Sequence, residues 1–421
     1  MLVKISRYLK AFMLLVFFSS SSFSALCANA LDKPANSMEV LNTGGAQPNS
    51  SVLSNIVDRA KQTKSDTLLI LQHGLPLVQY QSANRHDMIE IMSATKSIVS
   101  LAVGFAIDEN LIPSVDSPVY WFFPEWNQGE KKDITIRHLL THTSGLAAEP
   151  TTEEIYRSDN IVQLALDAKL ITSPGSTFFY NNKATNLLSG IIQRVSGRSL
   201  DAYLKDHLFA PLEISKVAWS FDRAGIPYGM AGLSIGASDL AKIGQLMLQN
   251  GLWKQKVVIS KSWINESTKI TQSSVSQPVG LLWWLNFGEE GFQFYYDSTL
   301  LTSYRAAGIP TQYVKKLESI IDRRFSRNDF AKKLIELFGS AEQADIFFAQ
   351  VRKAQLPDSR RGFNPQSEVK AFSARGYLGQ YLVVIPSKQI VAVRQIHAQT
   401  VRENPTIDTG FDDFESLLLS L

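Results

Sequence analysis

One segment limits what this chain can fold into more than any other. Met92–Ile107 is apolar on almost every side when it is wound as a helix, and a helix of that kind belongs inside a protein. It nevertheless carries Lys96 in its first turn, three residues after Ser93. Positions i and i+3 share one face of a helix, so we expect the serine hydroxyl and the lysine amine to meet.

This pair has a chemical and a structural interpretation. A buried amine loses its hydration and its pKa falls, so it can serve as the neutral base that activates a neighbouring serine. In the structural interpretation, Ser93 caps the helix and Lys96 extends to the surface. A second Ser-x-x-Lys, Ser367–Lys370, lies in a polar connection. The spacing alone therefore does not decide between the chemical and the structural interpretation. That decision needs the other motifs of the chain.

The N-terminus predicts export. Lys4, Arg7 and Lys10 precede an apolar run, and small residues follow up to Ala30. This order is typical of a secretory signal peptide over residues 1–30, with an uncleaved membrane anchor as the alternative. We therefore expect a periplasmic or secreted protein, which meets a membrane only if the leader stays in place.

Composition excludes several classes of function for the mature chain. The leader holds three of the 42 Lys+Arg residues and no acidic residue, so the mature chain has 39 basic against 39 acidic residues. A net charge near zero predicts neither a nucleic-acid partner nor an anionic membrane surface. The one cysteine, Cys27, also lies in the leader. The mature chain therefore has no disulfide, thiol nucleophile or thiolate metal site.

Strand signals lie at both ends of the chain and helix signals between them. After a flexible linker (31–52), we expect one domain over 53–421. The expected strands are Thr67–His73, Leu77–Tyr80, Phe372–Ile385 and Gln389–Ile396. The expected helices are Val57–Lys64, one that Thr135 caps and Gly145 stops, Asn160–Ala168, Lys183–Val195, Leu200–Leu208, Ser238–Gln249 and a closing helix, Phe411–Leu421. This pattern predicts an α/β (α+β) fold, in which an antiparallel sheet built from both chain ends is flanked by helices and a mostly helical lobe is inserted.

The charged, helix-rich segment 310–355 is expected to be an insertion, with Ser326 and Ser340 as helix caps. It is either a lid over the cleft or an ordinary surface element.

Two further motifs follow the Ser-x-x-Lys in order. Tyr180-Asn181-Asn182 is the only Tyr-x-Asn in the chain, and Arg375-Gly376-Tyr377 is expected to open a late strand. The order resembles the serine β-lactamase and penicillin-binding-protein superfamily. Within it, the chain resembles the class C branch, with its D-Ala-D-Ala carboxypeptidase, esterase and small-amide hydrolase relatives. The segments Ile134–Leu146, Pro174–Asn182, Ala231–Leu233 and Gly280–Trp284 match that branch too.

The resemblance implies a role for each motif residue. Ser93 attacks a carbonyl carbon and forms an acyl-enzyme, Lys96 takes the serine proton, and Tyr180 donates a proton to the leaving group. Asn182 binds a substrate amide, and the backbone N–H groups of Ser93 and Tyr377 form the oxyanion hole.

The third motif departs from the family pattern. The family usually has Lys or His, then Thr or Ser, then Gly, and here the hydroxyl is absent. Arg375 is expected to bind a substrate carboxylate, or else to form an ordinary salt bridge. Arg-Gly-x-x-Gly-Gln is nearer to the esterase and small-amide hydrolase members than to efficient β-lactamases.

The sequence therefore predicts an exported serine hydrolase that cleaves a small-molecule or peptide-like ester or amide without a cofactor or metal. His138 and His142 stand at i and i+4, and we assign them to packing rather than to zinc. One alternative is a slow-turnover or non-catalytic penicillin-binding sensor of the same fold. Another is an α/β-hydrolase that uses Ser234 in Gly232-Leu-Ser-Ile-Gly236, with His397 as its base.

Overall fold

The computed structural model describes residues 39–40, 50–83, 86–148, 151–271, 277–288, 291–354, 356–363, 367–406 and 408–421. The predicted signal peptide lies outside the described residues. So does most of the predicted linker, but Glu39–Val40 within it form a short strand and the first helix begins at Ser50, seven residues before the predicted start at Val57.

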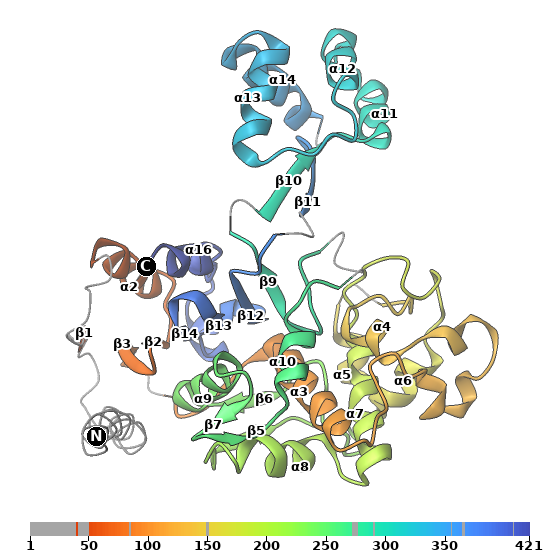
Figure 1. The fold of residues 1–421 in the computed structure, drawn as a ribbon, viewed down its shortest axis with the longest axis vertical. Coiled ribbons are helices and arrows are strands. Elements are labelled where there is room, and N and C mark those ends of the chain that lie inside the picture. Colours follow the sequence, from red (N-terminus) through yellow and green to blue (C-terminus); the bar gives the residue numbers. More distant parts are fainter. Residues whose placement is uncertain are drawn as a thin grey trace, which may run out of the picture.

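The centre of the molecule is a seven-stranded antiparallel sheet (Figure 1), with strand order β1-β3-β2-β14-β13-β12-β9. Its strands are β1 (Glu39–Val40), β3 (Leu75–Gln81), β2 (Thr67–Gln72), β14 (Ile390–Gln395), β13 (Gln380–Ile385), β12 (Ala371–Gly376) and β9 (Trp284–Asn286). Because β2 pairs with β14, the two ends of the chain meet in the middle of the sheet. The predicted fold class is confirmed.

Both faces of the sheet are buried. Successive side chains of a strand point to opposite faces, and apolar side chains lie on both. On β2, Leu69 and Leu71 face the large core around helix α3 (Thr95–Asp108), together with helix α9 (Ala237–Leu248). Leu68 and Ile70 face the opposite way, toward a second core. That core lies under helices α2 (Ser50–Gln62) and α16 (Phe414–Ser420). In Figure 1 these two helices lie together on one side of the sheet, near the C-terminus.

A mostly helical lobe is inserted between β3 and β9. Its elements are η1 (Met92–Ala94), η2 (Val119–Trp121), η3 (Pro124–Trp126), η4 (Gly129–Asp133), α4 (Ile136–Leu140), α5 (Glu153–Arg157), α6 (Ile161–Asp167), α7 (Asn182–Ser196), α8 (Leu200–Leu204), the π-helix η5 (Lys205–Phe209) and α10 (Lys261–Ser267), besides α3 and α9. Its short strands are β4 (Ile89–Glu90), β6 (Leu233–Ile235) and β5 (Val217–Trp219), which pair with one another, and β7 (Leu252–Trp253) with β8 (Lys256–Val257). Thr135 caps α4 as predicted, but that helix ends at Leu140 and not at Gly145.

The late strand predicted over Phe372–Ile385 is two strands. A 3₁₀ turn, η8 (Tyr377–Gly379), separates β12 from β13 because Leu378 and Gly379 have φ angles of 67° and 76°, a left-handed conformation that an extended strand cannot contain. The Arg375-Gly376-Tyr377 motif therefore closes β12. The prediction that it opens a strand is wrong.

Helices fill the segment predicted as an insertion, and they belong to a larger unit with its own apolar core from Tyr296 to Val351. The unit comprises β10 (Phe292–Tyr295), α11 (Ser298–Ala306), α12 (Thr311–Glu318), α13 (Arg327–Phe338), α14 (Ala341–Lys353) and β11 (Arg360–Phe363). Ser326 and Ser340 cap α13 and α14 as predicted. Figure 1 shows these helices apart from the central sheet, joined to it through β10 and β11.

The remaining elements are the turn η9 (Pro386–Lys388) and helix α15 (Ala398–Glu403). Among the helices that the structure describes, none has both the length and the apolarity to cross a membrane.

Candidate active site

Ser93 and Lys96 meet as their spacing predicts. The Lys96 Nζ atom lies 3.1 Å from Ser93 Oγ and donates a second hydrogen bond of 2.7 Å to the carbonyl oxygen of Met230. Lys96 is only 3% exposed, and the Ser93 side chain caps neither η1 nor α3. The structural interpretation, a capping serine and a surface lysine, is therefore wrong.

The surroundings of Lys96 favour its neutral form. Burial lowers the pKa of Lys96, and the nearby Tyr180 opposes that shift only in part. The amine lies 4.9 Å from the centre of the Tyr180 ring. A lysine with a lowered pKa is a better proton acceptor for the serine hydroxyl than a solvated lysine.

Tyr180 is held between two rings. His142 lies 4.4 Å from it and Trp284 stacks at 6.4 Å, measured between ring centroids. Burial lowers the pKa of His142 to about 3, and the proximity of Lys96 adds to this shift. His142 is therefore neutral at physiological pH, and its Nδ1 accepts a hydrogen bond of 3.2 Å from the backbone N–H of Asn181.

The two asparagines after Tyr180 differ in their surroundings. Asn181 is buried and caps helix α7, accepting from the Ala184 N–H at 2.9 Å and donating to the Leu146 carbonyl at 2.7 Å. Asn182 stands in the first turn of α7 and is partly exposed. Among the described residues its amide has no hydrogen-bond partner, so it is available to a ligand.

Sequence reasoning missed Asn186, which positions the second partner of Lys96. Its Oδ1 accepts from the backbone N–H groups of Gly229 and Met230 at 3.0 and 3.1 Å. Helix α7 thus holds the peptide whose carbonyl binds Lys96. Asn186 lies one helical turn after Asn182, and that spacing was the only signal in the sequence.

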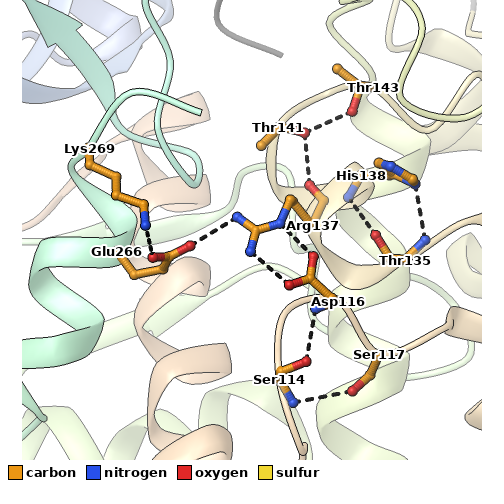
Figure 2. Close-up of polar contacts among 10 residues, drawn as sticks. All are labelled: Ser114, Asp116, Ser117, Thr135, Arg137, His138, Thr141, Thr143, Glu266 and Lys269. Carbon is orange, nitrogen blue, oxygen red and sulfur yellow. Dashed lines mark hydrogen bonds and ion pairs between the residues drawn. The ribbon is translucent and has the colours of Figure 1, made fainter. Parts of the chain in front are cut away.

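An ion-pair network anchors the loop that carries His142 (Figure 2). Arg137 bonds both carboxylate oxygens of Asp116, at 2.6 and 2.9 Å, and one oxygen of Glu266 at 2.9 Å. The Thr141 hydroxyl bonds the Arg137 carbonyl and the Thr143 hydroxyl, each at 2.8 Å. Arg137 thereby links the loop before α4 to helix α10 and to the residues on either side of His142.

The histidine pair His138/His142 has structural roles. His138 completes a capping box on Thr135, its Nδ1 accepting from the Thr135 N–H at 3.2 Å, and His142 lies against Tyr180. Across the part of the chain that the structure describes, no group of three His, Cys, Asp or Glu residues could hold a metal ion.

The third motif reaches the site through its backbone. A Cβ atom on Gly376 would lie 2.2 Å from the Ile91 carbonyl oxygen and 3.2 Å from the Ala94 nitrogen. Only glycine permits this approach, which places the end of β12 against the turn that carries Ser93. The next residue, Tyr377, follows this contact directly and is 75% exposed.

Arg375 lies on the face of β12 that α16 covers, with its guanidinium 5.6 Å from the Trp284 ring that stacks on Tyr180. Side chains alternate along β12, and Arg375 shares the α16 face with Ser373 while Phe372 and Ala374 join the core around α3. Its guanidinium forms two hydrogen bonds of 2.8 Å with the carboxylate of Glu415, which is 4% exposed. The salt bridge is thus present, with a buried partner, and Arg375 is not brought together with Ser93, Lys96 and Tyr180.

The rival nucleophile Ser234 lies inside strand β6, between β4 and β5 of an antiparallel sheet. A nucleophile elbow needs its serine on a turn between a strand and a helix. His397 caps α15 and stacks on His86, with 3.8 Å between ring centroids. This geometry does not support the α/β-hydrolase alternative.

Known proteins resemble the chain over most of its length. A family model described as Beta-lactamase matches residues 53–408. The 6-aminohexanoate-dimer hydrolase of Paenarthrobacter ureafaciens is 26% identical over 232 residues, 50% of this chain and 59% of that protein. Protein flp of Staphylococcus aureus is 33% identical over 133 residues, 30% of this chain and 26% of that protein. The chain thus spans less than two thirds of the length of each of these relatives.

A solved structure shares the fold. A putative 6-aminohexanoate-dimer hydrolase from Bacillus anthracis superposes with a TM-score of 0.56 at 16% identity, over 91% of this chain and 87% of that one. The family match, the shared fold and the order of the motifs agree: this chain belongs to the β-lactamase family.

Proposed function

We propose that this protein is an exported serine hydrolase that cleaves an ester or amide bond of a small molecule through an acyl-enzyme on Ser93. The observation that carries the proposal is the 3.1 Å contact between Ser93 Oγ and the buried Nζ of Lys96. A buried amine beside a serine, with a tyrosine ring against it, is an arrangement for activating the hydroxyl.

The reaction begins with proton transfer from Ser93 Oγ to neutral Lys96. The oxygen attacks the substrate carbonyl carbon, and the backbone N–H groups of Ser93 and Tyr377 stabilise the developing oxyanion. Tyr180 donates a proton to the departing alcohol or amine, and the C–O or C–N bond breaks. Water then attacks the acyl-enzyme and gives a proton to the Tyr180 phenolate. The bond from the acyl carbon to Ser93 Oγ breaks, Lys96 returns its proton to that oxygen, and the acid leaves.

The Arg375–Glu415 pair supports an ester or small amide over a β-lactam. Because Glu415 already neutralises Arg375, that guanidinium is a poor anchor for a substrate carboxylate. A family VIII carboxylesterase and a class C β-lactamase both share the fold, each with a TM-score of 0.53, so the preference rests on the ion pair and not on the fold. The side-chain amide of Asn182, which has no hydrogen-bond partner among the described residues, supports recognition of a polar group next to the scissile bond.

Hydrolysis of a p-nitrophenyl ester by the purified chain tests the proposal. We expect Ser93→Ala to reduce the rate to the uncatalysed background, and Ser367→Ala, the serine of the second Ser-x-x-Lys, to leave it unchanged. Mass spectrometry after fluorophosphonate treatment should locate the adduct on Ser93. A fully active Ser93→Ala variant, or an adduct on Ser234, would overturn the proposal.

The same experiment distinguishes a penicillin-binding sensor from a hydrolase. A sensor would release one equivalent of p-nitrophenol and then stop, with the acyl group retained on Ser93. A hydrolase continues at a steady rate after any burst. Export is tested separately by N-terminal sequencing of protein recovered outside the cytoplasm, for which we expect Leu31 as the first residue.

A further inference from the structure

The turn that carries the Tyr377 backbone is bound from behind by a buried arginine. Arg394 of β14 is 0% exposed. Its Nη1 donates hydrogen bonds of 2.8 and 2.7 Å to the carbonyl oxygens of Leu378 and Gly379. These two residues have the positive φ angles that separate β12 from β13, so the arginine bonds the carbonyls of the two residues that make the turn.

The other donors of Arg394 hold it in place. Its Nε donates to Ser65 Oγ at 2.8 Å, and its Nη2 donates to the carbonyl and hydroxyl oxygens of Thr63 at 3.2 and 3.1 Å. All of these acceptors are neutral, and among the described residues no carboxylate forms an ion pair with Arg394. Burying a charge in this way is costly, which argues for a role beyond filling space.

Burial lowers the pKa of Arg394 to about 10. That value still lies well above neutral pH, so the side chain keeps all its donors there.

Two glycines permit the close contacts at the two ends of this turn. A Cβ atom on Gly379 would lie 2.1 Å from Arg394 Nη1, and one on Gly376 would lie 2.2 Å from the Ile91 carbonyl oxygen. The turn is thus held at one end against the backbone around Ser93 and at the other against a guanidinium. The backbone N–H of Tyr377 lies between these two contacts.

We propose that Arg394 is a positioning residue for the oxyanion hole: by binding the Leu378 and Gly379 carbonyls it holds the Tyr377 N–H toward the tetrahedral intermediate on Ser93. This inference rests on the proposed function, in which Ser93 is acylated. A preorganised donor lowers the barrier because it does not have to reorient when the oxyanion forms. A donor on an unsupported turn loses part of that benefit.

Three variants test the inference in the full chain. Arg394→Met keeps the length and removes every donor. Gly379→Ala keeps Arg394 but places a methyl group where Nη1 lies. Thr63→Val is the matched control, because it removes a buried hydroxyl partner of Arg394 and leaves both turn contacts in place. Each variant is measured for kcat and KM on a p-nitrophenyl ester, for affinity toward a boronic acid that forms a tetrahedral adduct on serine, and for Tm.

We expect Arg394→Met and Gly379→Ala to lower kcat about 10- to 100-fold with KM within about threefold, a partial loss of one oxyanion donor. Boronic acid affinity should fall in parallel. Thr63→Val should lower Tm while kcat stays within about threefold of the parent. Arg394→Lys, which keeps a cation able to reach a carbonyl, should recover part of the kcat lost in Arg394→Met.

Two results would overturn the inference. One is an unchanged kcat and boronic acid affinity in folded Arg394→Met, or in Gly379→Ala if the methionine variant does not fold. The other is a loss of kcat in Thr63→Val equal to that in Arg394→Met at the same loss of Tm, since Arg394 would then be merely structural. Neither result affects the proposed function, which fails if Ser93→Ala stays active or if the fluorophosphonate adduct is on Ser234.

Discussion

The buried carboxylate of Glu415 holds the guanidinium of Arg375 through two hydrogen bonds of 2.8 Å. Ser373 Oγ and Asn286 Nδ2 donate to the same carboxylate at 2.5 and 2.9 Å. The guanidinium also lies 5.6 Å from the centre of the Trp284 ring, which in turn stacks on Tyr180. The C-terminal helix thereby supports, through one ion pair, a ring that contacts a proposed catalytic residue.

Glu415→Gln should destabilise the protein through this ion pair. The amide leaves Arg375 without its counterion, and because that arginine is 39% exposed, water compensates for part of the loss. We expect a decrease in unfolding free energy of about 1–3 kcal/mol, measured by denaturant titration. Glu368→Gln breaks an exposed pair with Lys370, which water screens, so the denaturant midpoint should match that of the parent. Equal effects of the two substitutions would contradict this account.

The pH dependence of acylation should follow Lys96. Its pKa is lowered from the usual 10.5 by burial, and the neutral amine is the form that accepts the serine proton. The kcat/KM for ester hydrolysis should therefore rise with pH and level off below pH 10.5, as the amine loses its proton. Lys96→Arg, which cannot lose its proton, should be inactive at every pH. A rate that is independent of pH would argue against this assignment.

Stability should fall with acid because of His142. Its folded-state pKa is about 3 against an ordinary 6.5, so between these values the unfolded chain binds one more proton than the folded chain. A depressed histidine pKa therefore makes folding less favourable as pH falls from 6.5 toward 3, by about 1.4 kcal/mol per pH unit. Urea titrations of the parent and of His142→Asn should show a shallower slope in the variant. Identical slopes would exclude His142 as the cause.

Two tyrosines should respond differently to removal of their phenol. Tyr180→Phe removes the proposed proton donor and should lower kcat by about 100-fold or more. Tyr377→Phe keeps the backbone N–H and changes only a side chain that is 75% exposed, so its kcat should match the parent within about twofold. Steady-state kinetics on one ester gives kcat for both variants. A large loss in Tyr377→Phe would show that its hydroxyl, rather than its backbone, acts in the site.

Substrate length should depend on a groove beside Trp284. This groove has a volume of about 760 Å³ and is lined by Phe292 and Arg327 of the inserted unit and by Ser416 of α16. Trp284 and Arg375 line the groove too, and Trp284 stacks on Tyr180, so the groove lies next to the proposed site.

Ser416→Trp should therefore fill the groove and lower the rate on long-chain esters at least threefold relative to short-chain esters. The control, Ser319→Trp, alters an exposed residue of the inserted unit that does not line the groove. An unchanged ratio in Ser416→Trp would mean that substrate chains do not enter this groove.

The sequence by itself determined the fold class and singled out the candidate nucleophile. Ser93 lies in the 3₁₀ turn η1 and Lys96 in the first turn of α3, three residues later, and successive helical turns bring positions at this spacing together whatever surrounds them. Strand signals at both chain ends likewise predicted a sheet built from both ends, because strand pattern is a local property of the sequence. In the structure, β2 from one end pairs with β14 from the other. Thr135, Ser326 and Ser340 were predictable as caps for the same reason.

Only the tertiary structure decided what each cation does. Arg375 and Lys96 are both basic residues, yet one binds Glu415, 40 residues away, and the other lies beside Ser93. The partner of Arg375 depends on the face of β12 on which its side chain lies and on the packing of α16 against that face. Asn186 and Arg394 escaped prediction for the same reason. Their partners are distant in sequence, and spacing within one element carries no information about contacts between elements.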